Sequence, residues 1–348
     1  MFSWIGCVAF FLLSPMVFAD GLFQVAAGAE PGLSFDPDVQ IEFEIEAAFS
    51  KIRRERDKSA SYPGRLTHAG QVFDVSLSPR GNTRLNSDNC RYPPLWIDFD
   101  KADIKNTVFG HQKHVKLVVL CRSGDKYRDY VRGEYIVYKM LNLLTPHSFQ
   151  VRWASVTYHD DGKIKTEPAF FIERKARLAK RNGLEKVNLE GIEYSQLAQH
   201  DNAVATLFQY IVANPDYSFV VGNDGDCCHN AKLFKNDTAE FIPVPYDFDS
   251  SGIVNASYAV PAKHLGIRKT TTRVYRGHCM HNDDLQQARE KILATDDQMI
   301  ALLASDAYLR NKTASKMAKY LSDSLTILRS DELYESEILD MCRSDNKG

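Results

Sequence analysis

Three short polar stretches in the second half of the sequence carry the residue types that phosphoryl transfer uses. They are residues 214–218 (Asn-Pro-Asp-Tyr-Ser), 229–234 (His-Asn-Ala-Lys-Leu-Phe) and 245–249 (Pro-Tyr-Asp-Phe-Asp). Their order gives an Asp on a loop, an Asn at the start of a strand and an Asp at the end of the next strand. In phosphoryl transfer one Asp orients the acceptor hydroxyl, while Asn and a second Asp hold Mg²⁺ on the nucleotide phosphates. The sequence therefore predicts the metal and base arrangement of that reaction.

The elements that must position these stretches follow from the spacing of the apolar residues. Residues 127–144 and 194–213 predict helices, which end at Thr145-Pro146 and at Asn214-Pro215. Alternating or β-branched apolar runs predict a hairpin over residues 66–77 and strands over residues 39–49, 95–99, 115–120, 151–158, 169–173 and 240–244. Two amphipathic helices are predicted over residues 284–304 and 307–328.

The order of these elements predicts an α+β fold with two lobes. A strand-rich N-terminal lobe covers residues 20–180, and a helical C-terminal lobe covers residues 181–348 and carries the three polar stretches. Ligands commonly bind between such units, so we expect the chemistry to take place in a cleft between the lobes.

The N-terminus indicates export. Residues 1–19 are apolar and uncharged, and Val17-Phe18-Ala19 has the small residues of a cleavage site, so the segment is typical of a secretory signal peptide. The alternative is an uncleaved anchor helix. No later run of about 18 apolar residues follows, so we expect no transmembrane segment after cleavage. The protein is expected to be secreted, periplasmic or part of the cell envelope, and its net charge of −2 argues against a nucleic-acid partner.

Cleavage would leave six cysteines, an even number that suggests disulfides in an oxidising compartment. A zinc site is the alternative, but the sequence has no Cys-x-x-Cys spacing. Cys90 and Cys121 flank predicted strands, so we expect them to pair. Cys227 or Cys228 is expected to pair with Cys279, and Cys342 with the cysteine that remains.

Further motifs lie in the N-terminal half of the chain. They are residues 78–83 (Ser-Pro-Arg-Gly-Asn-Thr), 94–99 (Pro-Leu-Trp-Ile-Asp-Phe), and 116–120 (Lys-Leu-Val-Val-Leu) followed by 130–135 (Tyr-Val-Arg-Gly-Glu-Tyr). Together with the three polar stretches, their order resembles the CotH kinase family and, in pattern, HipA-type kinases. The resemblance covers about residues 66–255. It implies a protein-kinase-like fold that binds ATP and Mg²⁺.

The resemblance implies roles for the polar residues of the second half. Asp216 is the expected catalytic residue, and Asn230 and Asp247 are the expected Mg²⁺ ligands, with Asp249 assisting. The interval between Asp216 and Asn230 is longer than the roughly four residues of protein kinases, so Asn223 is an alternative to Asn230. His229 beside it is interpreted as an orienting or core histidine.

The resemblance also implies a nucleotide site in the first half. Lys116 is the expected phosphate-binding lysine, and Glu134 is its expected partner on the following helix. Arg80 and the Gly81 turn are expected to approach a phosphate, and Glu173 corresponds to an acidic residue near the lobe junction. The sequence contains no Gly-x-Gly-x-x-Gly loop, so nucleotide binding is not predicted from that motif.

These features predict an exported kinase-like enzyme that transfers a phosphoryl group from ATP to a hydroxyl of a protein or of a cell-envelope molecule. Two alternatives remain open. One is adenylylation or glutamylation on the same fold. The other is a non-catalytic binding or adhesion module, because ATP is scarce outside the cytoplasm. Tyr258, Arg273, Tyr275 and Arg276 are candidates for the acceptor side of the site.

Overall fold

The computed structural model describes residues 40–99, 102–104, 107–110, 112–222 and 227–344 of the chain. The predicted signal peptide, residues 1–19, and the alternative ligand Asn223 lie outside these residues. Within them, no helix is long and apolar enough to cross a lipid bilayer.

The first part of the chain forms a closed barrel in the strand order β1-β2-β3-β4-β5-β7-β6. The strands are β1 (Ile41–Ala47), β2 (Tyr62–His68), β3 (Gln71–Pro79), β4 (Leu95–Asp98), β5 (His114–Val118), β6 (Val151–Asp160) and β7 (Lys163–Ile172). All neighbouring pairs are antiparallel except β1 and β6, whose parallel pairing joins Ile41 to Ala154 and closes the barrel. A short helix, α1 (Phe49–Glu55), follows β1.

Alternation of apolar and polar residues along the strands fills this barrel. In β1 the residues Ile41, Phe43 and Ile45 are buried and the glutamates between them are exposed, as expected for a strand with one face toward a core. Aromatic rings occupy the interior: Phe43 stacks on Phe171 with ring centroids 5.4 Å apart, and Phe99 stacks on Phe109 at 4.9 Å.

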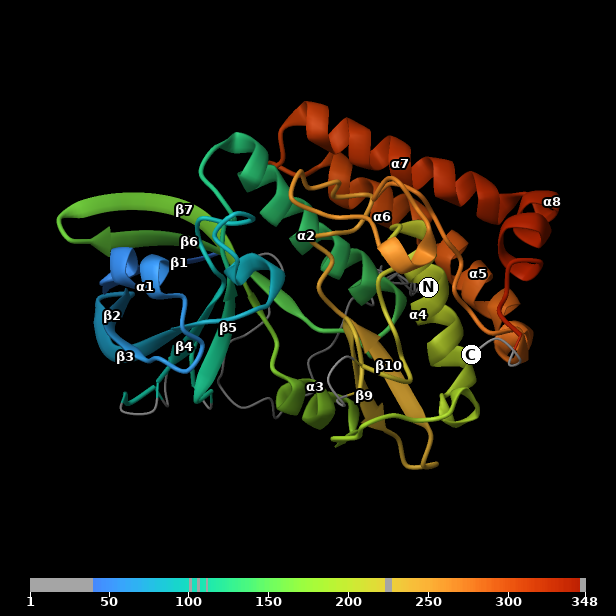
Figure 1. The fold of residues 1–348 in the computed structure, drawn as a ribbon, viewed down its shortest axis with the longest axis horizontal. Coiled ribbons are helices and arrows are strands. Elements are labelled where there is room, and N and C mark those ends of the chain that lie inside the picture. Colours follow the sequence, from blue (N-terminus) through green and yellow to red (C-terminus); the bar gives the residue numbers. More distant parts are fainter. Residues whose placement is uncertain (1–39, 100–101, 105–106, 111, 223–226, 345–348) are drawn as a thin grey trace, which may run out of the picture.

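Helices gather beside the barrel and bury a second core (Figure 1). They are α2 (Asp125–Leu144), α4 (Gln199–Ile211), α5 (Leu285–Ala294), α6 (Asp296–Ala304), α7 (Asn311–Arg329) and α8 (Asp331–Tyr334). Helix α2 lies between the barrel and the other helices, and its residues pack with both (Figure 1). Its Gly133 lies against Met317 of α7.

A small antiparallel sheet completes the fold in the order β10-β9-β8. Its strands are β8 (Glu185–Lys186), β9 (Ala231–Lys235) and β10 (Phe241–Pro245), and α3 (Lys175–Asn182) connects β7 to β8. The sheet lies below α2 and α4 in Figure 1. It matters for function because β9 and β10 carry two of the three polar stretches.

The predicted two-lobed protein-kinase-like fold is wrong. The strands between residues 41 and 172 close into a seven-stranded mixed barrel instead of an open sheet in a separate lobe. The closing contact pairs β1 with β6, segments about 110 residues apart, and local apolar patterns do not reveal such a pairing. The predicted helix over residues 284–304 is also two helices, α5 and α6, separated at Thr295.

Three disulfides are present among the described residues. Cys90–Cys121 confirms the first predicted pairing. The second prediction was wrong, since Cys279 pairs with Cys342 and the adjacent Cys227 and Cys228 pair with each other. The Cys90–Cys121 bond ties the loop after β3 to the end of β5. The disulfides fit the predicted oxidising compartment.

Candidate functional site

Lys116 lies in the middle of β5, opposite Trp96 of β4 and Ile172 of β7. Its ammonium nitrogen lies over three aromatic rings, at 5.6 Å from the ring centroid of Trp96, 5.7 Å from that of Phe149 and 5.8 Å from that of Tyr246. Such rings attract a cation through their negatively charged faces. In the described part of the chain Lys116 forms no ion pair, so the rings are its main contacts.

Other cations surround Lys116. Arg80 lies just after β3 with its guanidinium 5.7 Å from the Trp96 ring, and Lys232 of β9 lies 5.5 Å from the Tyr246 ring. Burial first, and then the charges of Arg80 and Lys232, lower the pKa of Lys116 to about 7, while the charge of Asp247 acts in the opposite direction. Lys116 therefore lies close enough to two other cations to be repelled by them.

Carboxylates lie on the other side of this group, where β10 ends. Asp249 is buried and lies 3.9 Å from the guanidinium of the buried Arg84, and Glu134 of α2 is 2% exposed. Burial first, then the charges of Asp249 and Asp247, raise the pKa of Glu134 well above its usual range. The Oε2 atom of Glu134 has no hydrogen-bond partner among the described residues. A buried carboxylate oxygen without a hydrogen-bond partner lowers stability, and a functional role is one reason why a protein retains it.

Asp247 is the accessible carboxylate of this group. Its backbone adopts the left-handed region at φ 67°, and its amide donates a hydrogen bond of 2.9 Å to the hydroxyl of Tyr138 on α2. Its side chain is exposed to solvent, yet the surrounding protein and the charge of Asp249 raise its pKa above the usual range. At this left-handed turn an accessible carboxylate thus lies near the cations Arg80, Arg84 and Lys116.

Asp216 pairs with His229. The loop after α4 and the start of β9 are held together by reciprocal backbone hydrogen bonds between Ser218 and His229 of 3.0 and 3.2 Å. His229 Nε2 then lies 3.2 Å from Asp216 Oδ2. This contact lowers the pKa of Asp216 and raises that of His229, and the charge of Asp247 raises the latter further. The contact therefore favours the ionised form of Asp216 and the charged form of His229, and His229 also lies near the charge of Asp247.

Several predicted site residues have surroundings that differ from those their expected roles require. No ion pair joins Lys116 and Glu134 within the described residues. Glu173, at the end of β7, is fully buried and bound to Arg181 at 2.9 Å, which leaves it no access to a ligand. Asn230 donates from Nδ2 to the backbone oxygen of Asp216 at 2.7 Å, so it braces the loop. Gly81 adopts φ 90° in an exposed turn directly after Arg80.

The sequence interpretation missed Lys232 and Arg84. Lys232 has the same signal as Lys116, a lysine between apolar residues of a short strand, and that parallel could have found it. Arg84 lies in a single 3₁₀ turn, Thr83–Leu85, and only the folded chain shows its contacts with Val119 and Asp249. Of the proposed acceptor-side residues, Arg273 stacks on Tyr320 and has a structural role.

The carboxylates at the end of β10 could bind a metal cation that takes its remaining ligands from a nucleotide and from water. In the part of the chain that the structure describes, no cluster of three or more His, Cys, Asp or Glu side chains could hold a metal ion by itself. Mg²⁺ on a nucleotide needs only one or two carboxylates, because phosphate oxygens and waters supply the rest. Asp247 and Asp249 meet this need, and the unpartnered oxygen of Glu134 lies beside them.

Comparisons with known proteins add no family to this description. No protein-family model matches the chain, and no curated protein is significantly similar to it. The geometry and the charges of the site are therefore what indicate a function.

Proposed function

We propose that this protein binds the phosphate chain of a nucleoside triphosphate and transfers a phosphoryl group to a hydroxyl acceptor. The observation that carries the proposal is the convergence of Arg80, Lys116 and Lys232 beside the accessible Asp247. Cations that lie so close repel one another, and a polyanion is the ligand that removes this repulsion. Phosphate groups also suit Arg and Lys donors, which bind them through charge-assisted hydrogen bonds.

Each side chain has a role in this proposal. Arg80, Lys116 and Lys232 bind the phosphates, and Asp247 with Asp249 would hold Mg²⁺, which neutralises phosphate charge when bound. Asp216, kept ionised by His229, accepts the hydrogen bond of the acceptor hydroxyl and orients its oxygen. That oxygen forms the new P–O bond, the bridging P–O bond to the nucleoside diphosphate breaks, and the acceptor proton passes to Asp216.

The acceptor class follows from the predicted export of the chain. A secreted or cell-envelope enzyme would meet Ser and Thr hydroxyls of proteins and hydroxyls of envelope molecules. The disulfides support that location. Mass spectrometry of a modified acceptor would separate phosphoryl transfer from nucleotidyl transfer or glutamylation.

Calorimetric titration with ATP and Mg²⁺, and with pyrophosphate, tests the first step. We expect wild type to bind both, and Lys116→Met to lose roughly tenfold in affinity, because one charge-assisted contact disappears. Lys163→Met is the matched control, since Lys163 is an exposed lysine at the start of β7, and its affinity should equal wild type. Absence of binding by wild type would reject the proposal. Binding without transfer would favour a non-catalytic module.

A further inference from the structure

The loop that carries Asp216 is held by side chains on three consecutive backbone oxygens. The Nη1 atom of Arg276 donates to the oxygens of Pro215 and Tyr217, each at 2.5 Å. Asn230 donates to the oxygen between them, on Asp216, at 2.7 Å. The loop runs from the last turn of α4 to the bridge between Ser218 and His229, and these bonds fix its backbone on both sides of Asp216.

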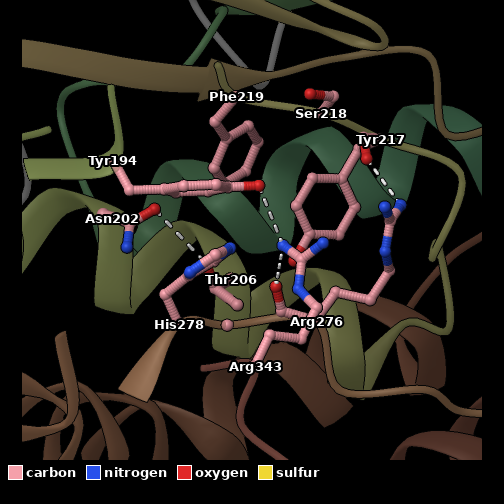
Figure 2. Close-up of a pocket in the computed structure, with 10 residues that line it drawn as sticks. Tyr194, Asn202, Thr206, Tyr217, Ser218, Phe219, Arg276, His278 and Arg343 are labelled. Carbon is pink, nitrogen blue, oxygen red and sulfur yellow. Dashed lines mark hydrogen bonds between the residues drawn. The ribbon is translucent and has the colours of Figure 1, made fainter. Parts of the chain in front are cut away.

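Arg276 is itself held in place (Figure 2). Its guanidinium lies 5.2 Å from the ring centroid of Tyr217. Its backbone oxygen accepts a hydrogen bond of 2.6 Å from Arg343, whose guanidinium also donates to the hydroxyl of Tyr194 at 3.2 Å. Figure 2 shows the guanidinium of Arg343 between Tyr194 and Tyr217, and the guanidinium of Arg276 on the other side of the Tyr217 ring.

A disulfide fixes Arg343. Cys342 precedes it and is bonded to Cys279, and the backbones on both sides of this bond are paired. The amide of Arg343 donates to the oxygen of Gly277 at 2.8 Å, and the amide of Cys279 donates to the oxygen of Arg343 at 3.1 Å. The end of the described chain is thereby anchored to the segment that carries Arg276.

The space enclosed by these residues is small. The cavity that Figure 2 shows has a volume of about 10 Å³, which is room for one water and not for a substrate. Its residues therefore serve the loop and do not bind a ligand of their own.

We propose that Arg276 is a positioning residue that holds the Asp216 carboxylate against His229, and that the Cys279–Cys342 disulfide keeps Arg276 in place through Arg343. The inference rests on the proposed function only in its purpose, which is to orient the acceptor hydroxyl. The positioning itself is measurable without any substrate.

The sign of one measurement separates positioning from a simple charge effect. The charged groups that face His229 are Asp216, Asp247 and Arg276, and His264 also faces Asp216. The positive charge of Arg276 by itself lowers the pKa of His229. If Arg276 acted only through that charge, its removal would raise the pKa of His229. If it holds the loop, its removal loosens the contact with Asp216 and lowers that pKa.

NMR titration of the histidines, with the His229 signal assigned from His229→Gln, makes this measurement. We expect Arg276→Gln to lower the pKa of His229 toward its ordinary value. Arg276→Lys keeps the charge but cannot bond both carbonyls in the same geometry, so it should lower the pKa by less. Arg273→Gln is the matched control: this arginine lies three residues away, donates to the oxygen of Tyr320, and should leave His229 unchanged.

A second variant tests the disulfide. Cys279→Ser with Cys342→Ser should shift His229 in the same direction as Arg276→Gln, by a smaller amount. An unchanged or raised pKa of His229 in Arg276→Gln would overturn the inference. If wild type does not bind nucleotide, the proposed function is rejected, but the effect of Arg276→Gln on the pKa of His229 still stands. Failure of the proposed function and failure of this inference are therefore distinguishable.

Discussion

Glu173 and Glu134 are both buried carboxylates, but the protein surrounds them in opposite ways. Glu173 is fully buried and accepts two hydrogen bonds from Arg181 and one from the amide of Gln150. Glu134 is almost as buried and lies beside Asp247 and Asp249, and one of its oxygens has no hydrogen-bond partner in the described part of the chain. Burial alone is thus a poor sign of function. Incomplete compensation of a buried charge is the better one.

The largest expected effect is on the compensated side of this comparison. Glu173→Gln should lower the free energy of unfolding by roughly 3 kcal/mol, because it breaks a buried ion pair and leaves Arg181 uncompensated. Urea unfolding followed by circular dichroism measures this change. Glu190→Gln is the control, because Glu190 is an exposed glutamate that also precedes α4 in the sequence. Its free energy of unfolding should stay within about 0.5 kcal/mol of wild type. A loss below 1 kcal/mol for Glu173→Gln would remove the contrast.

The second-largest effect concerns the packing of the segment that follows Asp249, on the side of the molecule that holds Glu134. A Cβ on Gly252 would lie 2.7 Å from the Cβ of Ala213 and 2.7 Å from the backbone oxygen of Thr270. Gly252 also donates to the oxygen of Ala213 at 2.7 Å, which joins the segment after Asp249 to the loop before Asp216. Gly252→Ala should therefore destabilise by about 1–3 kcal/mol through overpacking.

Thermal unfolding of Gly252→Ala beside Ser257→Ala, an exposed neighbour, checks this prediction. If Gly252→Ala unfolds at the temperature of wild type, the two loops are not in close contact. The missing hydrogen-bond partner of Glu134 beside Asp247 and Asp249 would then be explained by loose packing.

The third effect is smaller and opposite in sign. The pKa of Glu134 is raised in the folded protein, so between its unfolded and folded pKa values the native state binds more protons than the unfolded state. Stability is therefore lost as the pH rises through that window. Glu134→Gln removes the cost and should stabilise the protein at pH 8, on the order of 1 kcal/mol, with little effect at acidic pH.

Unfolding curves of wild type and Glu134→Gln at several pH values show whether the difference grows with pH. A variant that is less stable than wild type at pH 8 would mean that Glu134 is compensated there after all. The comparison with Glu173 would then fail.

The sequence predicts the strands and the residue types of the site, but it does not predict which strands pair or which site residues lie in contact. The alternation in residues 39–49 predicts a strand, and β1, Ile41–Ala47, confirms it with shorter bounds. The same alternation does not show that β1 pairs with β6, because strand partners leave no mark in a local pattern. Polar residues at the end of β10 predicted Asp247 and Asp249 in the same way, from a carboxylate where a strand should end.

The rest of the site required the folded chain. Arg84 approaches Asp249 from a 3₁₀ turn too short to show a periodicity, and Arg276 reaches the Asp216 loop from about 60 residues further along the chain. The expected Lys116–Glu134 pair was an analogy to another fold, and the barrel places aromatic rings around Lys116 instead.

The smallest effect concerns Lys116 in the protein without ligand. Lys116→Met keeps the apolar stem against Trp96, Phe149 and Tyr246 and removes the burial cost of the charge, the repulsion by Arg80 and the attraction of the rings. The lowered pKa shows that the charge is disfavoured on balance, so the variant should be at least as stable as wild type at pH 7. The pH dependence is the sharper measurement. The pKa of Lys116 falls from 10.5 to about 7, so between these values the unfolded state binds more protons and wild type gains stability as the pH rises. Lys116→Met should lack that gain, and unfolding at pH 7 and pH 10 compares the two. An equal gain in both proteins would show that the ammonium of Lys116 is well solvated, and the repulsion among neighbouring cations that supports phosphate binding would disappear with it.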